Sequence, residues 1–181
     1  DDTFAQIATY AGELDIPVHV HLHETVQEVS DSVKEHGLRP IARLEKLGLL
    51  GPGFIAVHAV HLNQEEVTVF ARHGCSVAHC PSSNLKLASG IAPVAALLQA
   101  GVNIGLGTDG AASNNRLDLF TEMRLAALLA KGVSGDPTVM PAHQALECAT
   151  LGGARALGLQ DRIGSITPGK LADLTAVKLS S

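Results

Sequence analysis

Histidines and carboxylates gather at the ends of several apolar, strand-like runs in this sequence. These runs and their polar residues are 17–24 with His19, His21, His23 and Glu24; 54–61 with His58 and His61; and 103–109, which ends at Asp109. In parallel α/β folds, chemistry collects at the carboxyl ends of the strands. Neutral imidazole and carboxylate are also ligands that zinc accepts. The pattern therefore predicts a metal-dependent hydrolase site at the strand tips.

Asp109 follows a short apolar run that has glycine at alternate positions, Gly105 and Gly107. Such a run is typical of a buried strand that other groups approach closely. The residues around Asp109 also suit an ordinary turn, which Asp and Gly favour. The position after a buried strand favours the functional interpretation. A carboxylate there can bind a metal and accept a proton from a bound water, whose pKa a divalent cation lowers.

The three histidines of the first run alternate, so on a strand His19, His21 and His23 would project to one face. A single histidine on an apolar strand is usually a satisfied core group. Three in a row are better explained as metal ligands. In the second run we favour His58 over His61 as the group that holds a bound water, because His61 runs into an expected helix cap.

Two other patterns are rejected as sites and one stays open. Residues 105–110 match G-x-G-x-x-G, but a carboxylate inside the loop would repel a pyrophosphate and no second βαβ unit follows. The His and Cys residues between 73 and 80 are not a zinc cluster, because Cys75 and Cys80 would lie at opposite ends of one strand. Residues 79–84 suit either substrate contact or a surface loop with a capping histidine.

Composition restricts the class of protein. The 181 residues suffice for one domain with a real core, and 46% hydrophobic with 17% charged residues excludes a disordered chain. The net charge of -5, without blocks of Lys or Arg, argues against nucleic acid or a membrane surface as partner. There is no apolar run of about 20 residues and no signal peptide pattern. Three cysteines without framework spacing fit a reducing compartment. We expect a soluble, cytoplasmic protein.

Apolar periodicity and turn residues predict alternating helices and strands. The expected helices are 4–14, 25–36, 39–50, 63–74, 93–100, 117–131 and 141–157, and the expected strands are 17–24, 54–61, 75–81 and 103–109. Residues 82–90 are expected to form a polar loop and 174–177 a short strand. Asn63 with Glu66 predicts a capping box, and Gly152 with Gly153 a weak point in the last helix.

Strands that alternate with helices predict an α/β fold with a parallel sheet and helical crossovers. A closed barrel of this kind needs about eight strands, so four units are half of one. We therefore expect the chain to be a fragment of a larger barrel.

Five stretches in the expected order resemble the amidohydrolase superfamily. They are residues 21–25, 57–62, 78–87, 107–115 and 164–174. Within that superfamily they are most similar to the branch of 5'-methylthioadenosine/S-adenosylhomocysteine deaminases, guanine deaminases and triazine chlorohydrolases. The resemblance covers essentially the whole chain and implies a metal-dependent (β/α)8 TIM barrel beside a small β-sandwich. Residues 1–160 would be its second half, with strands 5–8, and residues 161–181 would begin the C-terminal sandwich segment.

The resemblance also implies a role for four residues. His21 matches the metal-binding histidine after the fifth strand, and Glu24 matches the acid that shuttles protons to the substrate's ring nitrogen. His58 matches the histidine after the sixth strand that orients the hydrolytic water. Asp109 matches the metal ligand and general base after the eighth strand. Glu24 and Asp109 are thus the expected substrate-binding residues. The implied cofactor is one divalent metal, usually Zn²⁺, with Fe²⁺ or Mn²⁺ as alternatives.

The implied reaction is the release of ammonia from an adenosine derivative, because residues 110–115 look more like the methylthioadenosine/S-adenosylhomocysteine deaminases than the guanine deaminases. A purine-type small molecule is the expected partner, and a homo-oligomer the expected state of the full-length protein. In the family, the other two metal ligands form a His-x-His pair on the first barrel strand. We expect that strand to lie outside residues 1–181. A guanine deaminase, a triazine chlorohydrolase, or an inactive metal-binding or assembly module are the alternatives.

Overall fold

A parallel sheet forms the centre of the molecule in the computed structural model, which describes residues 2–178. Its strands, in spatial order, are β1 (Val18–Leu22), β2 (Phe54–His58), β3 (Ser76–His79) and β4 (Asn103–Leu106). All three pairings are parallel, with Ala56 opposite both Val20 and Val77, and Val77 opposite Ile104. Spatial order follows chain order because each crossover returns the chain to the next strand along. The predicted α/β fold with a parallel sheet is confirmed.

Helices separate the strands along the chain. They are α1 (Asp2–Leu14), α2 (Val26–His36), α3 (Pro40–Lys46), α4 (Gln64–His73), α5 (Pro81–Lys86), α6 (Val94–Gln99), α7 (Leu119–Ser134), α8 (Ala142–Glu147) and α9 (Gly153–Ala156), with a π-helical turn η1 (Cys148–Gly152) between the last two. Asn63 and Glu66 form the predicted capping box at the start of α4. Gly37 and Gly74 end α2 and α4 in the left-handed conformation, as their positions predicted.

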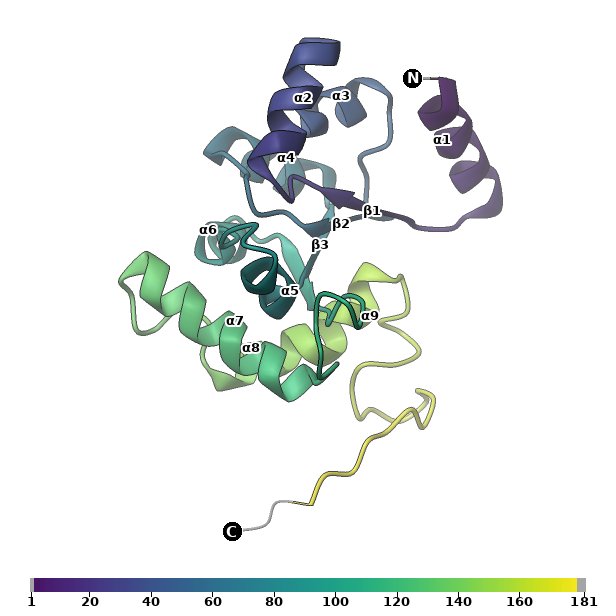
Figure 1. The fold of residues 1–181 in the computed structure, drawn as a ribbon. Helices are drawn as coiled ribbons and strands as arrows, with labels where there is room; N and C mark the ends of the chain where they lie inside the picture. The colour runs from purple at the N-terminus through teal and green to yellow at the C-terminus, as the bar shows by residue number, and fades with distance from the viewer. Residues whose placement is uncertain (1, 179–181) are drawn as a thin grey trace.

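The core lies between one face of the sheet and the helices that follow the strands. Strand residues in it include Leu22, Phe54, Ala56, Val77 and Ile104, and helix residues include Ile41 and Leu44 of α3, Val67 and Phe70 of α4, Leu97 of α6 and Ala126 of α7. Helix α1 lies beside β1 at the edge of the sheet (Figure 1). None of its residues is buried, but Phe4 and Ala8 pack against the core, and Arg43 of α3 lies over the Phe4 ring at 5.2 Å. Within residues 2–178 there is no helix with the length and apolar character to cross a membrane.

Several predicted boundaries are wrong. Strands β2 and β4 end at His58 and Leu106, earlier than expected, because the chain turns there. Residues 82–90 are not all loop, since α5 occupies 81–86, with Pro81 at its first position where a missing N–H is harmless. Residues 47–50 are not helical.

The segment after α9 extends away from the sheet (Figure 1). Residues 174–177 are exposed and irregular, so the strand expected there is not formed. The last part of the expected sandwich segment, residues 179–181, lies outside the described residues.

The two glycines expected to weaken the last helix have a packing role instead. A side chain at Gly152 would come within 2.2 Å of the Ile104 carbonyl oxygen, and one at Gly105 within 3.1 Å of the Gly153 Cα. Asn103 also donates a hydrogen bond to the Gly152 carbonyl at 3.0 Å. The helical segment therefore lies directly against the backbone of β4, an approach that only glycine permits.

Candidate functional site

The predicted site residues come from three different strand ends. His21 lies near the end of β1, His58 is the last residue of β2, and Asp109 follows β4 by a few residues. His58 and Asp109 have left-handed backbones, with φ of 72° and 59°. A non-glycine residue seldom adopts this conformation, and it is enriched at functional sites. The conformation turns the chain out of each strand at the residue that carries the functional group.

His21, His58 and Asp109 converge on one point. Each offers a ligand atom, and these atoms all lie within 4.8 Å of one another. The two imidazole rings meet edge to face, with centroids 4.8 Å apart and an interplanar angle of 87°. Within residues 2–178 this is the only such group of three or more His, Cys, Asp or Glu side chains. The rejected cluster between residues 73 and 80 accordingly does not converge.

Glu24 lies beside both imidazoles. Its Oε2 atom is 3.7 Å from Nδ1 of His21 and 3.7 Å from Nε2 of His58. The backbone under it is held by Glu28, whose two carboxylate oxygens accept hydrogen bonds from the N–H groups of His23 (2.8 Å) and Glu24 (2.7 Å). Glu28 therefore fixes the turn that aims Glu24 at the site.

His58 is fully buried and its tautomer follows from its partner. Its Nδ1 donates to the Oδ1 atom of Asn84 at 2.8 Å, which leaves a lone pair on Nε2. Nε2 is buried and has no hydrogen-bond partner among the described residues. A buried polar atom without a partner is costly unless another group satisfies it. Two imidazoles and a carboxylate also match the ligands of a divalent metal, so the residues fit such an ion.

The carboxylate of Asp109 is held by hydroxyl groups. Ser83 and Ser113 both donate to its Oδ2 atom, at 2.6 and 2.7 Å. Burial on its own would raise the pKa of Asp109, but these two hydrogen bonds, with a smaller effect from the Gly110 backbone and His58, lower it to about 2. Asp109 is therefore ionised at neutral pH.

The expectation that three histidines share one face is correct for His19 and His21, which alternate as exposed residues of β1, and wrong for His23, which lies beyond the end of the strand. His23 has a φ of 55° and turns into the protein, where it is fully buried. Its Nε2 accepts from the Ile41 N–H at 3.2 Å and its Nδ1 contacts the His61 carbonyl at 3.2 Å. Burial, opposed by the charge of Glu66, lowers the pKa of His23. His23 is a core histidine with both nitrogens satisfied.

The remaining histidines of the two runs lie away from the converging group. His61 contacts the Ser89 carbonyl through Nε2 at 2.7 Å, consistent with our preference for His58. His19 is exposed and lies beside α1 in an apolar hollow.

Sequence reasoning missed the residues that support the site. Ser83 and Asn84 lie on α5, in the segment for which substrate contact and a surface loop stayed open; the surface loop is wrong, and substrate contact stays a prediction. Both are buried and bind Asp109 and His58 respectively. The one signal for them was their position directly after a strand.

His79, at the end of β3, is buried and neither nitrogen has a partner among the described residues. Burial, with a smaller effect from His58, lowers its pKa to about 4, so it is neutral at pH 7.

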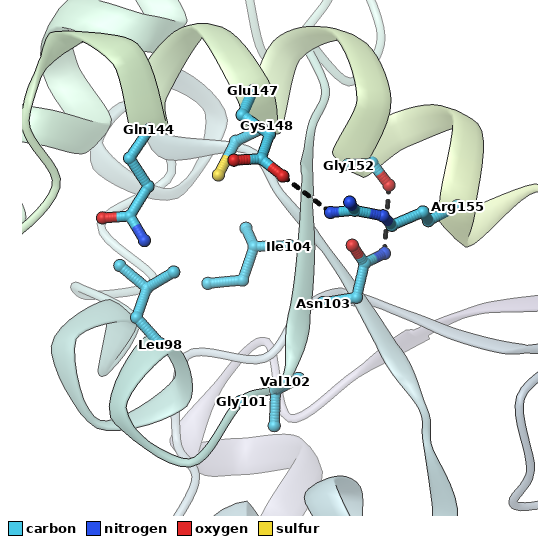
Figure 2. Close-up of a pocket in the computed structure, with 10 residues that line it drawn as sticks. All are labelled: Leu98, Gly101, Val102, Asn103, Ile104, Gln144, Glu147, Cys148, Gly152 and Arg155. Atoms are coloured by element: carbon cyan, nitrogen blue, oxygen red, sulfur yellow. Dashed lines mark hydrogen bonds and ion pairs between the residues drawn. The ribbon is translucent and has the colours of Figure 1, made fainter. Parts of the chain in front are cut away.

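A separate hollow lies at the start of β4. It encloses about 320 Å³ between the start of β4 and the helical segment 144–155 (Figure 2). Glu147 and Arg155 pair across it at 2.7 Å. None of its lining residues belongs to the converging group.

Comparison with known proteins covers the whole chain. The model of the Amidohydrolase family matches residues 1–181. The 5-methylthioadenosine/S-adenosylhomocysteine deaminase of Moorella thermoacetica is 55% identical over 174 residues, covering 96% of this chain and 41% of that protein. The chain thus spans about two fifths of the length of the curated relatives it matches.

Two solved structures extend the comparison. An adenosine deaminase from Xanthomonas campestris with bound zinc superposes with a TM-score of 0.92 at 56% identity, over 94% of this chain and 39% of that one. An atrazine chlorohydrolase from Arthrobacter aurescens complexed with zinc gives a TM-score of 0.88 at 32% identity, over 94% of this chain and 38% of that one.

Proposed function

The chain belongs to the amidohydrolase family, and from that premise we propose that residues 1–160 are strands 5–8, with their helices, of a (β/α)8 barrel. The open edges of β1 and β4 would each pair with a strand of the other half. Residues 161–181 would lead into a small β-sandwich. Two observations support this proposal: the parallel order of the four strands, and superposition on about two fifths of a longer relative with a TM-score of 0.92.

In the complete protein, His21 and Asp109 would hold one divalent metal, most simply Zn²⁺, together with a His-x-His pair from the first strand. The bound ion would supply Lewis acidity and lower the pKa of a water. The main observation in support is that the ligand atoms of His21, His58 and Asp109 lie within 4.8 Å of one another. Glu24 lies 3.7 Å from both imidazoles.

The reaction that we propose is hydrolytic deamination of an adenosine derivative such as 5'-methylthioadenosine or S-adenosylhomocysteine. Water adds to the ring carbon that bears the amine, the carbon–nitrogen bond breaks, and ammonia leaves. This requires an acceptor for the water's proton, a donor to the ring nitrogen, and a group that orients the water.

One residue of the site suits each of these three roles. Asp109 accepts the proton of the water: Ser83 and Ser113 both bind its Oδ2 and keep the carboxylate in one orientation. Glu24 carries the proton to the ring nitrogen from its position beside the two imidazoles. His58 orients the water by accepting a hydrogen bond at Nε2, which Asn84 keeps unprotonated by binding Nδ1.

The test is a substrate comparison on the complete, Zn²⁺-loaded protein. We expect ammonia release from 5'-methylthioadenosine and S-adenosylhomocysteine to exceed release from guanine, and chloride release from a chlorotriazine to be slower still. The similarity to atrazine chlorohydrolase makes the last substrate a meaningful competitor. Faster turnover of guanine or of the triazine would replace the adenosine derivative in this proposal. Zn²⁺ binding without hydrolysis of any of them would favour a non-catalytic module.

A further inference from the structure

Glu122 is a buried carboxylate that the reaction above does not use. It lies in the first turn of α7, and its side chain is 0% exposed. Within residues 2–178 no Lys, Arg or His forms an ion pair with it. Only uncharged hydrogen-bond donors therefore take the place of the water that would solvate the carboxylate. A carboxylate in such a place is costly unless its hydrogen bonds are well made. Its partners therefore indicate what it does.

One oxygen of Glu122 holds the start of α5. Its Oε2 atom accepts a hydrogen bond from the backbone N–H of Ser82 at 3.0 Å. The first N–H groups of a helix have no partner inside it and usually bind a capping side chain. Cys80 precedes α5 and provides no such side-chain bond. Glu122 therefore supplies, from another helix, the cap that α5 lacks.

The other oxygen holds the loop that carries Asp109. The Oε1 atom of Glu122 accepts from Nδ2 of Asn114 at 2.8 Å, and this amide nitrogen also donates to the Thr108 carbonyl at 2.9 Å. Asn114 in turn accepts two backbone N–H groups, those of Arg116 and Leu117, at 3.3 Å. The loop from 108 to 117 is thus folded around a single side chain that Glu122 holds.

The two segments joined by Glu122 meet again at the site. Ser83 and Asn84 follow directly after Ser82 and bind Asp109 at 2.6 Å and His58 at 2.8 Å. At the far end of α5, Lys86 donates to the Ala112 carbonyl at 2.6 Å and to the Asn115 side chain. A shift of α5 relative to the loop would therefore move the partners of both site residues together.

We propose that Glu122 is a positioning residue, which joins the start of α5 to the Asp109 loop so that Ser83 and Asn84 hold Asp109 and His58 in their working orientation. The inference rests on the proposed function of those two residues. It assigns a role in the site to a side chain that touches neither metal nor substrate.

The variant that tests this role is Glu122→Gln in the complete protein. Glutamine keeps the shape, but its amide nitrogen must face one of the two N–H donors, so one of the two hydrogen bonds is lost. We expect Zn²⁺ affinity, measured by competition with a chromophoric chelator, to fall at least about tenfold, as for other groups that orient metal ligands. We also expect kcat to fall with little change in KM, and the backbone amides of residues 82–87 to exchange hydrogen faster.

A matched control separates positioning from general stability. Phe70→Leu alters a fully buried residue of α4 and should lower the melting temperature. Because Phe70 has no part in the site, we expect the Zn²⁺ affinity of this variant and the hydrogen exchange of residues 82–87 to match the wild type. If Glu122→Gln does not fold, Asn114→Ala removes the same connection from the other side and should give the same losses.

A double-mutant cycle with Ser83→Ala shows whether Glu122 acts through α5. If it does, the two losses of Zn²⁺ affinity overlap and their sum exceeds the loss in the double variant; independent effects would add. Additive losses, or wild-type affinity and exchange in Glu122→Gln, would overturn the role. A wild-type protein that neither binds Zn²⁺ nor releases ammonia would instead defeat the proposed function, while the exchange measurement would still report on Glu122.

Discussion

Two buried glutamates, one on the β1–β2 side of the molecule and one on the β3–β4 side, are held in different ways. On the β1–β2 side (residues 18–73), Glu66 accepts two hydrogen bonds from Arg39, at 2.7 and 2.8 Å, and lies 3.5 Å from His23. On the β3–β4 side (residues 76–134), Glu122 has only the neutral donors Ser82 and Asn114.

The two glutamates differ in what the loss of their contacts should change. The Arg39–Glu66 pair on the β1–β2 side joins the residue before α3 to α4, so its loss should mainly affect stability. The neutral contacts on the β3–β4 side lead through α5 to Asp109 and His58, so their loss should mainly affect geometry.

The largest effect is expected from Asp109→Asn, on the β3–β4 side. The amide cannot accept the proton of the water and is a poor metal ligand. Turnover should fall at least about a thousandfold, with weaker Zn²⁺ binding, both measured on the complete protein. Asp118→Asn is the matched control, because Asp118 only caps α7. Near-normal ammonia release by Asp109→Asn would refute its role.

His58→Ala should have the next largest effect, because His58 connects the two sides by lying at the end of β2 and binding Asn84. We expect kcat to fall about a hundredfold. His61→Ala removes only a contact with Ser89 and should change kcat by less than about threefold. Steady-state kinetics of the two variants side by side provides the comparison, and equal losses would show that the wrong imidazole was chosen.

Glu28→Gln should have a smaller effect, from the β1–β2 side. Glu28 accepts the N–H groups of His23 and Glu24, and glutamine can accept only one of them. Glu24 would then be less well aimed, and we expect kcat to fall about tenfold. Glu35→Gln, on the exposed side of the same helix, should leave kcat unchanged. A wild-type rate in both variants would mean that the turn at Glu24 keeps its shape without Glu28.

Arg39→Met should have the smallest effect on turnover but a clear effect on stability. It leaves Glu66 buried without its cation, and we expect a loss of about 2 kcal/mol in the free energy of unfolding, reduced because Arg39 is one-third exposed. Ammonia release should stay within about threefold of wild type. Chemical denaturation at pH 7, beside the kinetic assay, measures both.

The same variant tests the pH dependence of stability. Burial opposes the ionisation of Glu66, but the hydrogen bonds from Arg39 and the Asn63 backbone, with the charge of His23, lower its pKa below the usual 4.5. A lowered pKa contributes stability above 4.5 that is lost as the pH falls through the folded value. The decrease in the free energy of unfolding between pH 5 and pH 3 should therefore be smaller in Arg39→Met than in wild type. An equal loss would show that Arg39 does not set this pKa.

The sequence predicted the framework of this site better than its support. Apolar runs over 17–24, 54–61 and 103–109, each ending in histidine or carboxylate residues, indicated three strand tips. The turn signals at Gly37, Asn63 and Gly74 marked helix ends correctly. These signals are local, because a cap or an alternating strand depends on a few neighbouring residues.

The supporting contacts depend on segments far apart in the chain, which a single sequence does not reveal. The inward turn of His23 requires Ile41 and the His61 carbonyl, and Glu122 meets Ser82 from forty residues away. The helix α5 was missed because its six residues lack a side-chain cap of their own. The tight approach of Gly152 to β4 likewise appears only when strand and helix are brought together.

The left-handed backbones of His58 and Asp109 carry one further consequence. Each such residue stores about 1–3 kcal/mol of strain, which glycine would release. Glycine at those two positions would relieve the backbone strain but would also remove the side chains that form the site. The protein therefore keeps backbone strain at the positions on which its proposed chemistry depends, a cost in stability that selection for activity tolerates.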